Sequence, residues 1–281
     1  MDGILLVNKE KGWTSNDVVQ KIKKIVKNKV GHTGTLDPLA TGVLPLLIGK
    51  GTSLSKYLIN HDKIYIATIK LGKKTETGDS EGKVIEEKEI PTKVLTKEYV
   101  ENVLSQFVGK QSQIPPMYSA IKVNGKKLYE YARSGKKIEV KAREIEIYAI
   151  DLIEVSNKNN EITFRVHCSK GTYIRSLIRD IGSSLNTFAT MTDLIRIKQG
   201  IFDIRDSYTL EDIENGNYKL IDIEDVMDIC VIENDTYLKD VTNGVKLKLD
   251  IENKYILFKH EGNNIALYKK DNDYFRMYIH F

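Results

Sequence analysis

The chain has 281 residues, of which 41% are hydrophobic and 29% charged. This composition excludes a disordered chain and suits one large globular domain or a large domain with an appendage. The longest apolar run, Val43–Ile48, is too short to span a bilayer, and the N-terminus shows no secretory leader, so we expect no membrane association. Cys168 and Cys230 lie far apart in the chain, which favours reduced thiols in the cytoplasm.

The net charge of +4 is unevenly distributed. Residues 211–281 contain nine basic and fifteen acidic residues, a balance of −6, which leaves +10 for residues 1–210. A basic body with an acidic end favours a polyanionic partner such as nucleic acid. Lysines that only face water explain the same excess equally well, and charge alone leaves both alternatives open.

The first predicted element is an amphipathic helix over residues 14–28. Its apolar side chains repeat with helical spacing on one face. Thr14, followed by Asp17 three residues later, forms a capping-box pattern at the start. The opposite face carries lysines, which we expect to face water.

A single acid, Asp37, follows a glycine-threonine loop and is itself followed by Pro38 and a nearly apolar run. Asp-Pro is a common helix start, in which the aspartate caps the helix, so a structural role is one alternative. A site at the mouth of an apolar pocket is the other, where an ionised group needs a partner. Four apolar neighbours favour this second alternative: Leu36, Leu39, Val43 and Leu44.

Two strands and two helices are predicted in the middle of the chain. Residues 62–72 alternate with period two and form a strand whose inner face carries Tyr65, Ala67, Ile69 and Leu71. Residues 96–110 form an amphipathic helix closed by Gly109. Residues 161–182 form a strand, a tight turn and a second helix.

Composition marks two further regions. Residues 113–141 contain two prolines, two glycines and many basic residues, which is typical of a long excursion from the core. Residues 211–228 contain seven acids against one lysine, and we place a domain boundary near residue 228. The rest of the chain is predicted to form short strands at residues 237–250, 254–260 and 265–270.

Several classes of site lack their sequence signature. The histidines have no metal-ligand spacing, so we expect no metal site; they are His32, His61, His167, His260 and His280. No phosphate-binding loop and no dinucleotide-binding glycine motif is present. The nucleophile elbow of serine hydrolases is absent as well.

Five segments carry a family resemblance: residues 3–19, 31–49, 62–82, 113–135 and 168–182. The second, GHTGTLDPLATGVLPLLIG, is similar nearly residue for residue to the active-site motif of the TruB family, the tRNA pseudouridine-55 synthases. A motif of this length is highly specific, whereas a lone Asp-Pro is not. The resemblance covers most of residues 1–200.

The resemblance implies that the protein isomerises a uridine in the T-arm of tRNA, at position 55, to pseudouridine. In this reaction the N1–C1′ bond breaks and a C5–C1′ bond forms, so no cofactor and no metal is needed. Asp37 corresponds to the family's nucleophile. A single ionised carboxylate suffices whether it attacks C1′ or acts through an elimination at the ribose, and both routes stay open.

The resemblance also implies roles around Asp37. Arg175 corresponds to the arginine that pairs with the aspartate; the alternative, a solvated arginine in the first turn of a helix, is an unfavourable place for a cation. Tyr65 corresponds to the tyrosine that stacks on the target uracil and handles the C5 proton. Tyr173 and Leu194 correspond to residues that line the uracil pocket. For these three, ordinary core packing is the alternative.

RNA binding is implied at further positions. The target base must leave its stack, at a cost of about a few kcal/mol, and His32 resembles the residue that occupies the space around the flipped nucleotides. Relatives often carry paired arginines after the pocket leucine, whereas here Ile195 precedes Arg196, so one contact to phosphate is missing or supplied elsewhere. Five further cations are expected to contact phosphates, although each alone could be a solvated charge: Lys9, Lys122, Lys126, Lys127 and Arg133.

The implied fold is α+β. A pseudouridine synthase catalytic domain, with a mixed, largely antiparallel central sheet flanked by helices, would occupy residues 1–228, and residues 113–141 would form its RNA-gripping insertion loop. A small β-rich, PUA-like RNA-binding domain would occupy residues 229–281. We expect a cytoplasmic monomer without an obligate protein partner.

Two other functions are weighed against this one. The first is an RNA-binding or RNA-folding protein without catalysis, which the trio Asp37, Tyr65 and Arg175 disfavours. The second is the guide-RNA-dependent relative, which shares the fold but works within a multiprotein particle. Activity of the purified chain alone would separate these alternatives.

Overall fold

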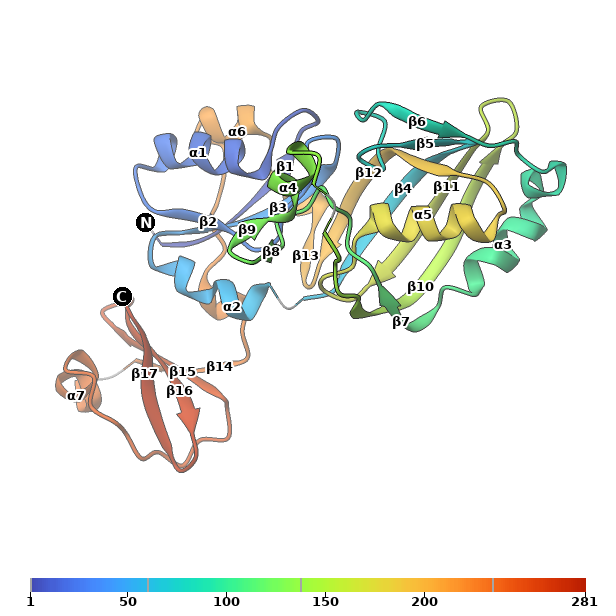
Figure 1. Ribbon diagram of the computed structural model, residues 1–281. Helices are drawn as coiled ribbons and strands as arrows, with labels where there is room; N and C mark the ends of the chain where they lie inside the picture. Colours follow the sequence, from blue (N-terminus) through green and yellow to red (C-terminus); the bar gives the residue numbers. More distant parts are fainter. Residues whose placement is uncertain (1, 60, 137, 234) are drawn as a thin grey trace.

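The computed structural model describes residues 2–59, 61–136, 138–233 and 235–281. Its body contains a nine-stranded sheet, in which hydrogen-bonded neighbours follow the order β1-β3-β12-β4-β11-β10-β7, with β2 paired to β3 and β13 paired to β12 (Figure 1). These strands are β1 (Gly3–Lys9), β2 (Val30–His32), β3 (Thr41–Ile48), β4 (Lys63–Leu71), β7 (Gly109–Gln113), β10 (Arg143–Ser156), β11 (Glu161–Cys168), β12 (Ala189–Gln199) and β13 (Phe202–Asp203).

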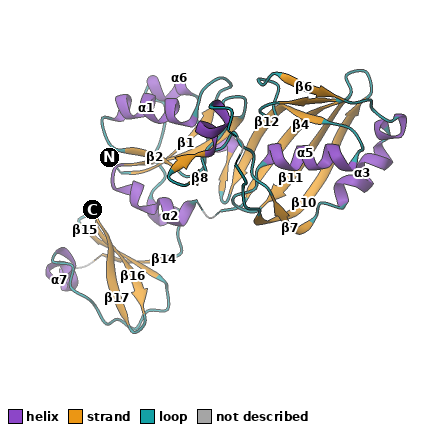
Figure 2. Cartoon of the chain, viewed as in Figure 1, coloured by secondary structure: helices purple, strands orange, loops and turns teal. Residues whose placement is uncertain are grey.

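Helices cover the sheet, as the secondary-structure colouring of Figure 2 shows. The α-helices of the body are α1 (Ser15–Val26), α2 (Ser55–Leu58), α3 (Lys97–Ser105), α4 (Leu128–Arg133), α5 (Ile174–Ser184) and α6 (Leu210–Glu214). Short 3-10 turns are η1 (Gly49–Leu54), η2 (Thr92–Leu95), η3 (Ile204–Asp206) and η4 (Ile223–Asp225). α3 and α5 lie over the half of the sheet that contains β4, β10 and β11, whereas α1 and α6 lie over the half that contains β1 and β3.

Most elements expected from periodicity are present. Helix α1 begins with the predicted capping box, in which the Asp17 backbone N–H donates to Thr14 Oγ1 over 3.1 Å and the Thr14 N–H donates to Asp17 Oδ2 over 3.0 Å. Strand β4 buries every second side chain on its core face, including Tyr65. The strand-turn-helix prediction for residues 161–182 is confirmed by β11 and α5.

Three sequence expectations are corrected. The predicted helix over residues 96–110 ends at Ser105, and Gly109, with φ of 110°, begins the strand β7. No helix starts at Asp37, because residues 33–40 form a loop that leads into β3, so the capping alternative is wrong. Residues 237–250 were expected to be strand but contain the helix α7 (Leu238–Thr242).

The two halves of the sheet meet at a narrow joint. Strands β3 and β12 pair in parallel through only two residue pairs, Ile195 with Thr41 and Arg196 with Gly42. The other pairings between the described strands of this sheet are antiparallel. The predicted mixed, largely antiparallel sheet is therefore confirmed, and the loop over residues 33–40 leaves the sheet beside this joint.

The segment predicted as an excursion contains a hairpin and a helix outside the central sheet. Residues 113–141 contain the hairpin β8 (Lys122–Val123) and β9 (Lys126–Lys127), followed by α4, and this hairpin does not join the nine-stranded sheet. In Figure 1 the segment, drawn in green, crosses in front of the middle of the sheet. A further hairpin, β5 (Lys73–Thr75) with β6 (Val84–Glu87), lies at the end of the body away from the N-terminus.

A second sheet forms the C-terminal part of the chain. It has the order β14-β15-β16-β17, with β14 (Ile229–Glu233), β15 (Tyr255–His260), β16 (Asn263–Asp271) and β17 (Tyr274–His280), and it carries η5 (Asp235–Tyr237) and α7. Alternate residues of β15 serve two cores. Tyr255 and Leu257 pack toward Leu54 and Leu58 of the body, whereas Ile256 packs in the core of the small sheet itself.

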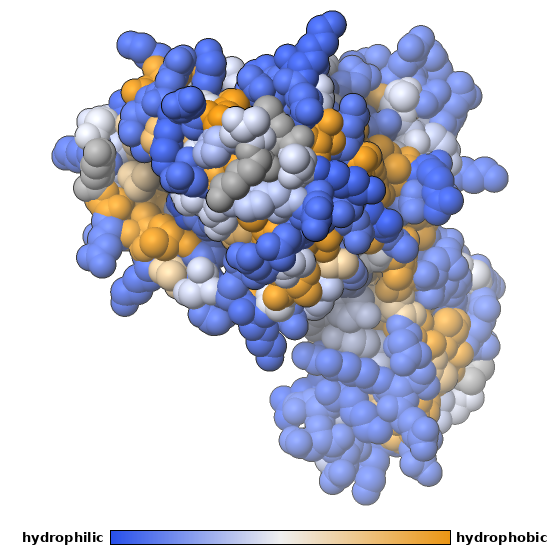
Figure 3. All heavy atoms as spheres, turned by 90° about the vertical axis from the view of Figure 1, so that its right-hand side faces the viewer, coloured by the Kyte–Doolittle hydropathy of each residue, from blue (hydrophilic) through white to orange (hydrophobic). Residues whose placement is uncertain are grey.

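The chain thus has an α+β body and a small β-rich C-terminal part, as predicted. Strand β14 begins at Ile229, beside the expected boundary at residue 228. The division into two domains and the PUA-like character of the C-terminal part stay predictions. Among the described residues no helix is long and apolar enough to cross a membrane. The end of the molecule that carries α3 is covered mainly by hydrophilic side chains, with hydrophobic ones in scattered groups (Figure 3).

Candidate active site

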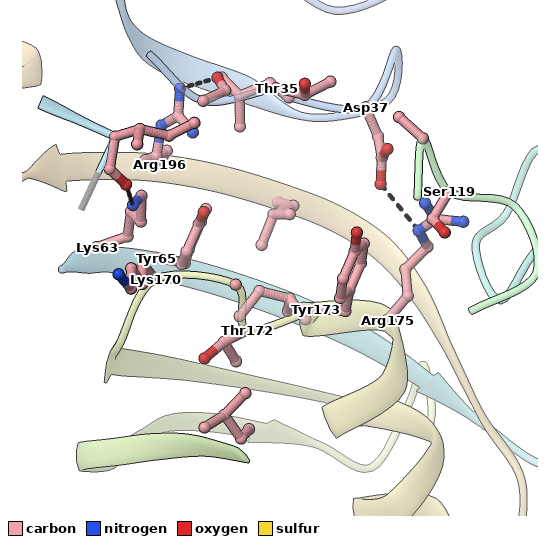
Figure 4. Close-up of a pocket in the computed structure, with 18 of the residues that line it drawn as sticks. Thr35, Asp37, Lys63, Tyr65, Ser119, Lys170, Thr172, Tyr173, Arg175 and Arg196 are labelled. Carbon is pink, nitrogen blue, oxygen red and sulfur yellow. Dashed lines mark hydrogen bonds and ion pairs between the residues drawn. The ribbon is translucent and has the colours of Figure 1, made fainter. Parts of the chain in front are cut away.

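A cavity of about 590 Å³ lies beside the joint between the two halves of the sheet. Its walls come from the loop over residues 33–37, Ile59, strands β4, β10 and β12, the first part of the insertion, and the segment 170–175 that leads into α5. Figure 4 shows the side chains that point into it. Segments far apart in the chain therefore enclose one space, which is what a binding site requires.

Asp37 is held at one wall by its neighbours in the loop. The Ser15 hydroxyl accepts a hydrogen bond from the Leu36 backbone N–H over 2.8 Å and donates to the Leu36 carbonyl over 3.0 Å. Leu36 itself is buried, so it pins the loop to the core. The Asp37 side chain is 34% exposed and faces the cavity.

Lys9 fixes the other side of the same loop. Its ammonium donates to the carbonyls of Glu10 over 2.9 Å, Trp13 over 2.7 Å and Pro38 over 3.3 Å. The side chain is fully buried, and burial lowers the pKa of Lys9 to about 8, although Asp37 opposes this shift. The predicted contact of Lys9 with phosphate is wrong, because its ammonium donates to backbone carbonyls inside the protein. One of these carbonyls belongs to Pro38, the residue that follows Asp37.

Arg175 pairs with Asp37. Its Nε lies 2.8 Å from Asp37 Oδ2, and the guanidinium is only 7% exposed. The remaining donors are satisfied by backbone, since Nη1 donates to the Thr77 carbonyl over 2.9 Å and Nη2 to the Tyr118 carbonyl over 2.8 Å. A bond between charged groups is stronger than a neutral one. The predicted pairing of these two residues is therefore present in the structure.

The position of Arg175 is unusual for a cation. It lies in the first turn of α5, where the helix dipole disfavours positive charge. The Asp37 carboxylate and the two carbonyl acceptors offset this cost and hold the side chain across the wall of the cavity. Such an arrangement is more consistent with a site than with a solvated surface arginine.

Tyr65 and Arg196 form the opposite end of the cavity. Burial raises the pKa of the Tyr65 phenol, while the Arg196 guanidinium, hydrogen-bonded to its hydroxyl, opposes the shift. Arg196 is 1% exposed and also donates from Nε to the Val43 carbonyl over 2.8 Å and from Nη2 to the Gly34 carbonyl over 3.1 Å. It thus ties the loop before Asp37 to β12.

Tyr173 and Leu194 complete the walls of the cavity, and their contact with uracil stays a prediction. The rings of Tyr65 and Tyr173 both point into the space beneath the loop over residues 33–37 (Figure 4). Burial raises the pKa of the Tyr173 phenol as well. The cavity therefore offers aromatic and apolar walls at its centre and the Asp37–Arg175 pair at one side, a combination suited to a flat polar ring attached to a sugar.

Comparison with known proteins identifies the family of the chain. The model for the N-terminal domain of TruB family pseudouridylate synthases matches residues 22–174, and the model for the tRNA pseudouridylate synthase B C-terminal domain matches residues 175–242. The chain belongs to the TruB family of pseudouridylate synthases. The predicted family, fold class and enzyme class are confirmed.

Similar proteins cover most of this TruB-family chain. tRNA pseudouridine synthase B from Clostridium kluyveri is 47% identical over 253 residues, which are 88% of this chain and 86% of that protein. The protein of the same name from Mesoplasma florum is 46% identical over 274 residues, with 96% and 94% covered. A chain in a solved Cbf5-Nop10-Gar1 complex is 26% identical with a TM-score of 0.66, over 95% of this chain and 78% of that chain.

Within this TruB-family structure, His32 lies outside the cavity walls. It is on the short strand β2, immediately before the loop that carries Asp37. Burial lowers the pKa of His32, and Arg196 adds to the shift. Its Nδ1 is buried without a hydrogen-bond partner. A position around the flipped nucleotides stays a prediction.

The predicted phosphate-binding cations of the insertion lie apart from the cavity. Of the described residues of the insertion, Ser119 and Ala120 are the ones that line the cavity. Three of the four cations are exposed, and Lys127, which is half-buried, places its ammonium 3.3 Å from the Tyr129 hydroxyl. The four are Lys122, Lys126, Lys127 and Arg133. Their contact with RNA stays a prediction.

Several cavity residues were not found from the sequence, among them Lys63 and Ser119. Lys63 is buried at the start of β4, donates to the Ile59 and His61 carbonyls, and has a pKa lowered by burial to about 8. Ser119 is buried at the base of the insertion, beside Arg175. The alternating burial of β4, which begins at Lys63, could have marked that residue. Ser119 stands in no pattern that distinguishes it from a surface residue. Among the described residues, no cluster of His, Cys, Asp or Glu could hold a metal.

Proposed function

We propose that this enzyme isomerises the uridine at position 55, in the T-arm of tRNA, to pseudouridine, with Asp37 as the nucleophile. The observation that carries the proposal is the 2.8 Å ion pair between Asp37 and Arg175 at the wall of a 590 Å³ cavity. Cavities of about 300–1,000 Å³ suit small ligands, so one extruded nucleoside fits here. The curated relatives at 46–47% identity carry the name tRNA pseudouridine synthase B, which supports the choice of RNA.

The proposed reaction is balanced without an added reagent. The Asp37 carboxylate attacks C1′ of the ribose and displaces uracil, breaking the N1–C1′ bond. The uracil turns, its C5 attacks C1′ and the aspartate leaves again. C5 then loses its proton to solvent and N1 is protonated, so the product is an isomer of the substrate. No electrons are exchanged, and for this reason we propose no cofactor.

Arg175 and Tyr65 would support this chemistry in different ways. Arg175 aims the carboxylate at the sugar and balances its charge, because its other donors are fixed on the Thr77 and Tyr118 carbonyls. The Tyr65 ring would stack on uracil, and because burial raises the pKa of its phenol, an ionised Tyr65 is disfavoured as the base for the C5 proton. Tyr173 and Leu194 would close the apolar space around the ring.

Binding of the RNA would rest on residues outside the cavity. Lys122, Lys126, Lys127 and Arg133 would contact backbone phosphates and supply affinity that falls with salt. His32 would lie near the nucleotides displaced with the target base. We also propose that the chain acts as a cytoplasmic monomer without an obligate partner, since its relatives of this name are more similar to it than the chain of the Cbf5-Nop10-Gar1 complex.

The test uses the purified chain alone and a tRNA transcript that carries tritium at C5 of its uridines. We expect release of tritium from one uridine per tRNA, and none when cytidine replaces uridine 55. No release from the first transcript would indicate a binding protein, or an enzyme that needs guide RNA and partners. Equal release from both transcripts would show that position 55 is not the target.

A further inference from the structure

The side chain of Gln113 makes an unusual contact at the root of the insertion. Gln113 ends strand β7, directly before Ile114, and is 3% exposed. Its Oε1 accepts a hydrogen bond from the Tyr173 backbone N–H over 2.8 Å, and its Nε2 donates to the Tyr173 carbonyl over 3.2 Å. One amide side chain therefore binds both polar backbone groups of a single residue 60 positions away.

The residue it binds is the start of α5. Tyr173 is the N-cap of this helix, and its own side chain makes no capping bond. Its carbonyl also accepts the first helical bond, from the Leu177 N–H over 3.1 Å. A second tie lies one turn further on, where the Ser176 hydroxyl donates to the Ile114 carbonyl over 2.8 Å. The beginning of α5 is thus fastened to the end of β7.

This fastening bears on the cavity, because both Tyr173 and Arg175 project from the first residues of α5. The backbone of Gln113 is itself fixed in the sheet, where it pairs with Arg143 of β10. Only an amide offers a donor and an acceptor at the spacing of a backbone N–H and carbonyl. Glutamate would keep the acceptor alone, and methionine neither group.

We propose that Gln113 is a positioning residue for the isomerisation: its amide holds the start of α5 so that Arg175 meets Asp37 and Tyr173 lines the cavity. It does not touch the substrate. This inference rests on the proposed function, in which Arg175 and Tyr173 serve catalysis.

The first experiment compares single-turnover rates at saturating tRNA for Gln113→Met and Gln111→Met. Gln111 lies on the same strand, and its amide donates to the Phe107 carbonyl over 2.7 Å, away from the cavity. We expect Gln113→Met to slow the reaction about tenfold or more, equivalent to about 1.4 kcal/mol, with tRNA affinity unchanged. Gln111→Met should retain the wild-type rate. An unchanged rate in Gln113→Met, or an equal decrease in both variants, would overturn the proposal.

The second experiment tests whether Gln113 acts through Arg175. Arg175→Lys should slow the reaction, and adding Gln113→Met to it should slow it little further, because two changes on one pathway are not additive. A full additional decrease would overturn the proposal. If Gln113→Met does not fold, Gln113→Glu replaces it, since it keeps the bond to the Tyr173 N–H but places an oxygen against the Tyr173 carbonyl. An unchanged rate in Arg175→Lys would instead refute the proposed function at Arg175.

Discussion

Gly42 lies at the joint between the two halves of the sheet, and its replacement by alanine should be unusually costly. Its φ is 104°, and an added Cβ would stand 2.3 Å from the Arg196 carbonyl oxygen. Gly109 provides a matched control, with φ of 110° and no atom within 4 Å of an added Cβ. Both alanine variants carry the strain of a left-handed residue, roughly 1–2 kcal/mol, but only Gly42→Ala also clashes.

The extra cost follows from the contacts at the joint. An ordinary carbon–oxygen contact is about 3.3–3.6 Å, so β3 and β12 must move apart by about 1 Å. This movement breaks the two-residue pairing, at about 1 kcal/mol for each hydrogen bond, and weakens the Arg196 bonds to Val43 and Gly34. We expect a further loss of about 2–4 kcal/mol in the free energy of unfolding, which lowers the melting temperature by about another 4–16 °C.

Thermal unfolding followed by circular dichroism measures both variants under the same conditions. Gly42→Ala should melt well below Gly109→Ala, and Gly109→Ala modestly below the wild type. If the two variants melt at the same temperature, β3 and β12 can move apart at the joint without a loss in the free energy of unfolding. In that case the close approach of β3 to β12 does not fix the loop that carries Asp37.

Three further predictions concern single side chains. Arg175→Ala should lower the single-turnover rate far more than the affinity for tRNA, since its contacts are to Asp37 and two carbonyls; an unchanged rate removes Arg175 from the mechanism. Burial lowers the pKa of Lys63 to about 8, against 10.5 when the side chain is exposed. Between pH 8 and 10 the unfolded chain therefore holds more protons than the folded chain, so the free energy of unfolding of the wild type should rise with pH relative to that of Lys63→Met. Equal pH dependence of the two proteins in urea titrations contradicts this. Lys122→Ala should reduce by about one the slope of log affinity against log salt, without changing the saturated rate, and an unchanged slope excludes a phosphate contact.

Periodicity in the sequence was sufficient for the elements that bury one face. Strand β4 and helix α5 lie where alternating or helical spacing of apolar residues placed them, because burial of these side chains stabilises each element. The prediction of a strand within residues 237–250 was wrong because a short helix and a short strand need similar runs of apolar residues. The prediction that Gly109 closes a helix was wrong because a glycine with positive φ suits the end of a helix and the start of a strand equally.

The candidate site was predictable only in part. Asp37, Tyr65 and Arg175 were found through the family motifs, and the ion pair between the first and last is present. Lys9 belongs to the same motifs, but its partners are carbonyls brought together by the folded chain, including that of Pro38, 29 positions away. Gln113 binds Tyr173 across 60 positions for the same reason. Such tertiary contacts between polar groups leave no periodic signal in a sequence.

The most direct test of the account measures Asp37→Asn beside Asp180→Asn, whose carboxylate pairs with Arg179 on the exposed side of α5. Tritium release from C5-labelled tRNA and the dissociation constant for the same tRNA are measured for both variants. We expect Asp37→Asn to release no tritium while binding tRNA within about tenfold of the wild type, or about 1.4 kcal/mol, and Asp180→Asn to behave as the wild type. Turnover by Asp37→Asn, or complete loss of its tRNA binding, would contradict a catalytic carboxylate at this position.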